Sequence, residues 1–348
     1  MAHSNRLLFG HLPSMPLPRV LGRIVNSSVR IQSVGFGNMP KEISSDVFLV
    51  DTLAAGIPGL VASYLIKGEK SALVDAGYPT SANTLLSELR ALDASWRQVD
   101  FLIPTHVHLD HAGGVGHLAR AMPKARILVN EHGAKHLIDP AKLIQSAVGL
   151  FGKEAMSLFG TPIPVPTDRV EMVSDVCDLD LGAGVGLRIF WTPGHAWHHM
   201  SVLIESERLL VTGDAVGLRY QGFDIPIPAT PPPGFNEEQY VKTLTGFTGM
   251  NLAGLLLPHF GLIREDLRGF LEKNLETIKQ CGSRAFDAVN FGEPVDRLFD
   301  WFMTDIANRA GKSLDEIPDH ITRNIMFSAM GCYSHAQEVR TKQRSLET

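Results

Sequence analysis

Residues 105–114 read Thr-His-Val-His-Leu-Asp-His-Ala-Gly-Gly, so three imidazoles and one carboxylate fall within six positions. Imidazole and carboxylate are the usual ligands of a catalytic divalent metal. An extended or turning backbone sends alternate side chains to opposite sides, so His106 and His108 can face one ion while the carboxylate and the third imidazole turn toward a second point nearby. A solvated, His-rich loop is the alternative, and matching segments elsewhere in the chain argue against it.

These matching segments are apolar runs that end in a polar residue of a metal-ligating type. The runs are Leu187–Trp191 before Thr-Pro-Gly-His195, Leu209–Val211 before Thr-Gly-Asp214, and Leu255–Leu257 before Pro-His259. Short apolar runs bounded by Gly and Pro are typical of buried strands, and α/β proteins place their chemistry in loops at strand ends. The candidate ligands are His106, His108, Asp110, His111, His195, Asp214 and His259. Seven ligands are too many for one tetrahedral ion, and they suit two ions that share a bridge.

In this order the motifs resemble those of metallo-β-lactamase-fold hydrolases, whose signature is a His-x-His-x-Asp-His loop, a distant His, a Gly-Asp and a final His. The resemblance covers roughly residues 45–262. It implies that Asp214 bridges two metals, and that Asp75, in the segment Leu-Val-Asp-Ala-Gly, orients a ligand. The implied ligands of the first metal are His106, His108 and His195, and those of the second are Asp110, His111 and His259.

One departure from the family pattern follows His195. Ala196-Trp197-His198-His199 stands where members similar to glyoxalase II often have Thr-x-Gly. The departure argues against a specific glyoxalase II assignment and leaves the metal ligands in place. Lactonase-like and thioesterase-like members remain compatible with the pattern.

The resemblance implies a four-layer αββα sandwich, and the alternation of expected strands and helices is compatible with that fold. We expect a catalytic domain over residues 42–263 with a helical insertion at about 130–173. Residues 264–348 carry helical apolar stripes that we expect to pack on the core or to form a homodimer contact. Residues 1–41 contain no Asp or Glu and four Arg, which suits a transit peptide for an organelle matrix or an N-terminal extension of a cytoplasmic protein.

Composition argues against several partner classes. The net charge is −5 with no strong basic block, which argues against nucleic acid as a partner. The absence of an apolar run of about 18 residues argues against a membrane span. The three cysteines are widely spaced, as in proteins of reducing compartments. A small-molecule substrate is therefore the expected partner. His132 and His136 share a helical face and could pair on a metal, although an ordinary helix surface is the favoured interpretation.

We therefore expect a dinuclear metal-dependent hydrolase that uses a hydroxide bridging its ions to cleave a carboxylic ester, lactone or thioester. Nitrogen and oxygen ligands without Cys suit zinc, and manganese or iron would also bind. Asp110 is the expected proton shuttle as well as a ligand. An apolar rim within residues 222–235 could line an acyl pocket or pack against the C-terminal helices; its members are Phe223, Ile225, Ile227 and Phe235.

Three alternatives stay open at this point. The same dinuclear site could cleave phosphodiesters, with Arg219 and Arg264 holding the phosphate. A mononuclear iron centre could oxygenate sulfur compounds. A scaffold that has lost its chemistry is disfavoured by the complete ligand set.

Overall fold

The structure is a computed structural model that describes residues 40–92 and 99–347. Its core is a pair of β-sheets. Only the last two positions of the expected N-terminal extension, residues 40 and 41, belong to the described residues. The targeting role expected for residues 1–41 therefore concerns residues that lie almost entirely outside them.

The first sheet has seven strands in sequence order. Its first half is antiparallel, and β4, β5, β6 and β7 run parallel to one another. Parallel neighbours need crossover connections, which helices supply here. The strands are β1 (Lys41–Glu42), β2 (Val47–Asp51), β3 (Ala62–Lys67), β4 (Ser71–Val74), β5 (Val99–Ile103), β6 (Arg126–Asn130) and β7 (Val170–Val173). The crossover helices are α2 (Ala82–Leu92), α3 (Leu109–Ala112), α4 (Val115–Ala121), α5 (Glu131–Ile138) and α6 (Ala141–Phe159).

The second sheet has six strands in the order β15-β14-β11-β10-β9-β8. Strands β11 and β14 of this sheet are parallel, and they are connected through α7 (Glu237–Thr248) and a separate hairpin of β12 (Leu218–Tyr220) with β13 (Phe223–Ile227). The strands of the sheet are β8 (Val176–Asp180), β9 (Gly186–Trp191), β10 (Met200–Ile204), β11 (Leu209–Val211), β14 (Gly254–Leu257) and β15 (Gly261–Ile263).

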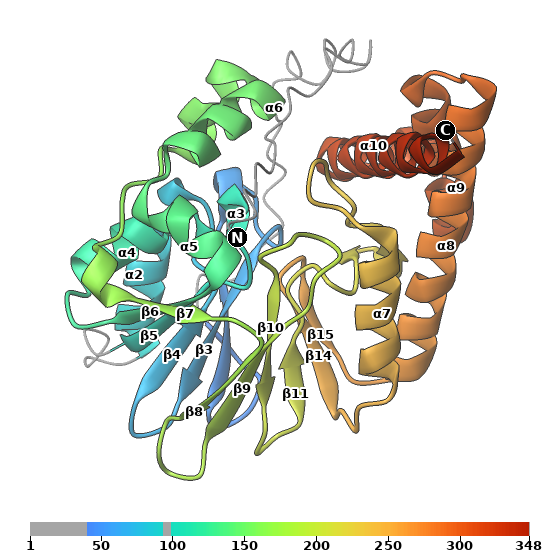
Figure 1. The fold of residues 1–348 in the computed structure, drawn as a ribbon. Helices are drawn as coiled ribbons and strands as arrows, with labels where there is room; N and C mark the ends of the chain where they lie inside the picture. Colours follow the sequence, from blue (N-terminus) through green and yellow to red (C-terminus); the bar gives the residue numbers. More distant parts are fainter. Residues whose placement is uncertain (1–39, 93–98, 348) are drawn as a thin grey trace. The chain divides into compact units, whose positions relative to one another are not determined.

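The period-two alternation of the strands explains why the sheets are covered on both faces. In β5, Leu102 packs with the helical residues Leu85 and Leu118, whereas its neighbour Ile103 packs between the two sheets. On the outside of the second sheet, the ring of Phe247 in α7 contacts the ring of Phe190 in β9 with their centroids 6.2 Å apart. The order helix, sheet, sheet, helix confirms the expected αββα sandwich (Figure 1).

The C-terminal region consists of long helices, as the apolar stripes predict. They are α8 (Leu267–Phe291), α9 (Val295–Ala310) and α10 (Asp319–Glu347), and they pack against one another and against α7 and β13. Within the part of the chain that the structure describes, no helix combines the length and hydropathy needed to cross a membrane.

Candidate metal centre

All seven expected ligands meet where strands of both sheets end. Their donor atoms form three overlapping groups, each with its atoms within 4.8 Å of one another. The first group is His106, His108 and His195, and the second group is Asp110, His111 and His259. A third set, His106, His111 and Asp214, overlaps both. His106 and His108 follow β5 of the first sheet, whereas His195, Asp214 and His259 follow β9, β11 and β14 of the second. Each group therefore takes side chains from both sheets.

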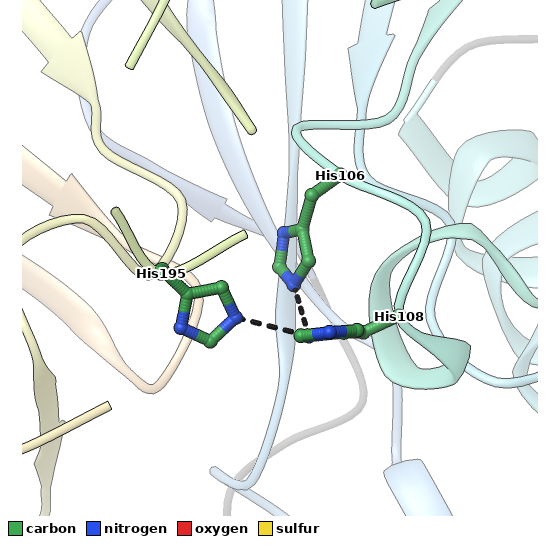
Figure 2. A group of neighbouring side chains, drawn as sticks. All are labelled: His106, His108 and His195. Atoms are coloured by element: carbon green, nitrogen blue, oxygen red, sulfur yellow. Dashed lines mark hydrogen bonds between the residues drawn. The ribbon is translucent and has the colours of Figure 1, made fainter. Parts of the chain in front are cut away.

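The first group places three imidazole nitrogens around one point (Figure 2). Nε2 of His106 and Nε2 of His195 each lie 2.9 Å from Nδ1 of His108. Nδ1 of His195 donates to the carbonyl oxygen of Ala229 at 2.8 Å, so its Nε2 presents a lone pair. Nδ1 of His108 can either donate a hydrogen bond to Nε2 of His195 or accept one from Nε2 of His106, but not both. One of these two close nitrogen–nitrogen contacts therefore has no hydrogen bond. A cation between the three would satisfy all of them.

Electrostatics keep these imidazoles neutral, which is the form that binds a metal. Burial lowers the pKa of His106 well below its ordinary value, and neighbouring imidazoles add to the effect. Burial and the adjacent His195 lower the pKa of His108 to about 3. These side chains therefore offer lone pairs at neutral pH.

The second group combines Asp110 with two imidazoles. Oδ2 of Asp110 lies 3.4 Å from Nε2 of His259 and 3.7 Å from Nε2 of His111. Nδ1 of His259 donates to the carbonyl oxygen of Leu60 at 2.9 Å, and Nδ1 of His111 contacts Oδ2 of Asp75 at 2.9 Å. These outer contacts turn both Nε2 atoms toward Asp110, as second partners of ligating imidazoles commonly do.

The carboxylates dominate the charge in this second group. Burial alone would lower the pKa of His111, but the charges of Asp214, Asp110 and Asp75 outweigh it and raise that pKa well above its ordinary value. Burial alone would raise the pKa of Asp110, but His111 and His259 outweigh it and hold that pKa below its usual range. Asp110 is therefore ionised at neutral pH, so it can accept a proton.

Asp214 lies between the two groups. Its Oδ1 is 3.5 Å from Nε2 of His111 and 3.8 Å from Nε2 of His259, while its Oδ2 is 3.6 Å from Nε2 of His195. Oδ1 is buried and has no hydrogen-bond partner among the described residues. An unpartnered buried carboxylate oxygen is costly unless a cation compensates it. Its position fits a carboxylate that bridges two metal ions.

Two side chains that sequence reasoning did not assign hold the backbone of Asp214. Nε2 of His199 accepts from the Asp214 amide at 2.9 Å. The hydroxyl of Tyr240, in α7, donates to the Asp214 carbonyl at 2.9 Å and accepts from the amide of Gly217 at 2.8 Å. Gly213, with φ +52°, is needed for this contact because an added Cβ would collide with the imidazole of His199. Two features of the sequence pointed to the contact between His199 and the Asp214 backbone: the departure from the family pattern at residues 196–199 and the Gly before Asp214.

Asp75 ties the first sheet to the ligand loop. Its Oδ1 accepts from the amide and the hydroxyl of Thr105, at 2.7 and 2.9 Å, and its Oδ2 contacts His111. Asp75 is nearly inaccessible and contacts His111 on the side away from the metal groups. Its contacts are those of a group that orients a ligand.

Several other candidates lie away from the centre. His132 contacts the Trp191 ring at 6.4 Å, and neither His132 nor His136 belongs to any group of described residues that could hold a metal. Arg219 pairs with Asp224 at 2.5 Å, and Arg264 is exposed. The structure therefore gives no support to a phosphate clamp formed by these two arginines.

The expected acyl rim packs against the C-terminal helices, as the alternative interpretation held. Phe223 is buried, with the ammonium of Lys312 5.2 Å from its ring centroid. The Phe235 ring contacts the rings of Tyr240 and His335 at 6.0 and 5.5 Å. Tertiary packing thus uses apolar side chains that the sequence pattern left available to a substrate.

The family model described as the metallo-beta-lactamase superfamily matches residues 56–253, more than half of the chain. The chain belongs to the metallo-beta-lactamase superfamily. Every side chain of the seven-ligand set except His259 lies inside the matched range. The superfamily consists mostly of metal-dependent hydrolases, and in this chain the His/Asp cluster is able to bind metal.

Relatives support the assignment. A metallo-beta-lactamase fold-containing protein of Sulfurisphaera tokodaii is 31% identical over 225 residues, which are 62% of this chain and 80% of that protein. The solved structure of an archaeal superfamily protein from Sulfolobus tokodaii is 28% identical with a TM-score of 0.57, covering 68% of this chain and 86% of its own. An atrochrysone carboxyl ACP thioesterase of Aspergillus fumigatus is 27% identical over 149 residues, which are 43% of this chain and only 37% of that protein.

Proposed function

We propose that this chain hydrolyses a carboxylic ester, lactone or thioester at a dinuclear metal centre that holds zinc. The position of the Asp214 carboxylate carries the proposal: one oxygen, which has no hydrogen-bond partner among the described residues, lies near His111 and His259, and the other lies near His195. The donor set is nitrogen and carboxylate oxygen without a thiolate, which suits zinc and also accepts manganese or iron. The thioesterase among the relatives supports an acyl substrate.

Metal ions held by these residues would polarise a substrate carbonyl and lower the pKa of a water molecule toward neutrality. The chain's own residues then act on protons and geometry. Asp110 is ionised and partly accessible, with a side chain 25% exposed, so it can take the proton of the attacking water and pass it to the leaving group. Asp75, His199 and Tyr240 hold the ligands in place, as the contacts of Asp75 to Thr105 and of Tyr240 to Asp214 indicate.

The test measures metal content and substrate class together. Protein purified without chelator should contain about two ions per chain by elemental analysis, and it should cleave a thioester or a lactone faster than a bis-aryl phosphodiester. A value near one ion with iron and oxygen consumption would favour the oxygenase alternative. Fast cleavage of the phosphodiester alone would replace the acyl proposal with phosphodiester hydrolysis.

Asp110→Asn tests the proton shuttle because it keeps the shape and removes the base. The turnover number should fall by roughly 10²–10⁴-fold even in metal excess. Asp287→Asn is the matched control, since Asp287 is exposed on α8. Full recovery of Asp110→Asn upon metal addition would reduce Asp110 to a ligand.

A further inference from the structure

One face of α10 lies against Tyr220, whose ring contacts the ring of the candidate ligand His259. Asn324 donates from Nδ2 to the hydroxyl of Tyr220 at 2.5 Å, and the His320 ring contacts the Tyr220 ring at 5.2 Å. Tyr220 is buried with its ring 5.8 Å from that of His259. One turn further along α10, the Phe327 ring contacts the Phe151 ring of α6 at 5.3 Å. Residues 320, 324 and 327 follow helical spacing, so they form one face that joins the site wall to α6.

Arg323 lies on this same face, between His320 and Phe327. Its charge acts on Tyr78 and on His320. Burial raises the pKa of Tyr78 well above its ordinary value, the charge of Asp110 raises it further, and Arg323 opposes the rise. Arg323 and Asp110 therefore both act electrostatically on Tyr78. The contacts of His320 and Asn324 with Tyr220 place the face of α10 that carries Arg323 beside the wall of the site.

The guanidinium of Arg323 has no carboxylate partner among residues 40–92 and 99–347, although other arginines of the C-terminal helices do. Arg309 pairs with Asp305 at 2.8 Å, and Arg284 pairs with Glu293 at 2.5 Å. Arg323 is half-buried in a chain of net charge −5. A half-buried cation without a partner attracts an anion, and a guanidinium presents a planar fork that matches carboxylate and phosphate oxygens.

We propose that Arg323 anchors an oxyanion of the substrate, a carboxylate or a phosphate, while the scissile carbonyl lies at the metal centre. This inference rests on the proposed function, and it narrows the substrate class to acidic esters, lactones or thioesters. Because α10 lies beyond residues 56–253, the anchor belongs to the C-terminal helices of this chain and not to the region matched by the family model. Arg323 would thus set specificity through binding.

The test measures binding without turnover. Calorimetry on the metal-loaded protein would compare succinate, glutarate and adipate with their monomethyl esters, in which one carboxylate is neutral. The diacid of the best length should bind about tenfold or more tightly than its monoester, since a hydrogen bond to a charged group has that value. The preference should disappear in Arg323→Gln and survive in part in Arg323→Lys. Arg297→Gln, an exposed change on α9, should keep the preference.

A second arm separates the two oxyanions. 4-Phosphonobutyrate has a phosphonate where glutarate has its second carboxylate, and the ligand with the larger Arg323-dependent gain identifies the anchored group. An equal preference in the unaltered protein and in Arg323→Gln would overturn the anchor for every ligand. Arg323-dependent binding without any ester cleavage would leave the anchor standing and refute the proposed function instead.

Kinetics supply an independent readout. In Arg323→Gln the KM for an acidic half-ester should rise about tenfold with kcat nearly unchanged, while a neutral diester should be unaffected. A loss of kcat for both substrates would mean that Arg323 acts on the catalytic geometry, which contradicts an anchoring role. Equal unfolding midpoints for the variants and the unaltered protein would establish that the fold is retained.

Discussion

At the scale of single residues, the centre depends on how the backbone of Asp214 is held. His199 accepts from its amide, and Tyr240 donates to its carbonyl. The carboxylate itself has an unpartnered oxygen, so its position is set by its own backbone and not by hydrogen bonds to that atom. The residues that hold this backbone should therefore control metal affinity without contacting the metal.

Tyr240→Phe removes the hydroxyl and leaves the ring. Metal affinity should fall by roughly 10–100-fold, the usual effect of losing an outer partner of a ligand. Unfolding should be easier by about 1 kcal/mol, because the Asp214 carbonyl and the Gly217 amide lose the hydroxyl and keep only their mutual hydrogen bond of 3.3 Å. Competition with a chromophoric chelator measures the affinity. Tyr333→Phe is the control, since the Tyr333 hydroxyl donates to the Glu293 carbonyl away from the centre. Equal affinities in the two variants would contradict this role for Tyr240.

The candidate ligands could be inferred from the sequence because each lies in or just after the segment that follows a recognisable apolar run. Their partners could not. Ala229 and Leu60 act through backbone carbonyls, which any residue could supply. Tyr240 lies in a helix between two ligand loops, so only tertiary structure brings its hydroxyl to Asp214.

At the scale of elements, α10 connects the C-terminal helices to the centre. The sequence predicts helices after residue 264, since apolar stripes at helical spacing are strong signals, but it does not show which polar face of α10 covers the site. The same limit applies to the acyl rim, because residues in β13 alternate in side-chain direction and Phe223 turned to the helices. The periodicity of a sequence indicates that one face of an element is buried. Which other element covers that face is determined by tertiary packing, which the periodicity does not show.

His320 should make stability depend on pH. Burial, together with Arg323 and His259, lowers its pKa from 6.5 to about 4. Between these two values the unfolded chain binds more protons than the folded one, so stability rises with pH across that window and is lost as the pH falls. The shift corresponds to at most about 3 kcal/mol.

His320→Gln should therefore flatten the dependence. Urea unfolding at intervals from pH 7 to pH 4 would show a shallower loss of stability in the variant than in the unaltered protein. His117→Gln is the control and should keep the full pH dependence of stability. His117 lies on α4, is partly exposed and contacts the Thr161 carbonyl instead of α10. Parallel curves for His320→Gln and the unaltered protein would show that His320 contributes nothing to the slope.

At the scale of the whole folded unit, the candidate metal centre joins residues that follow strands of the two sheets. His106 and His108 extend from β5, and the third member of their group, His195, extends from β9 of the other sheet. The second group joins α3, which follows β5, to His259 after β14 in the same way. A ligand that binds only the folded arrangement stabilises it by mass action.

Metal removal should therefore lower the thermal midpoint of the entire sandwich. With free metal at about 1,000 times its dissociation constant, binding contributes about 4 kcal/mol, which corresponds to a midpoint difference of several degrees. Scanning calorimetry with and without chelator measures it. His108→Ala should unfold near the chelated midpoint and respond little to chelator, because one ligand group has lost a member and a chelator has less to remove. If the unaltered protein melted at the same temperature in both conditions, the ligands would be brought together by packing alone, and the imidazole lone pairs and the Asp214 oxygen would need another source of compensation.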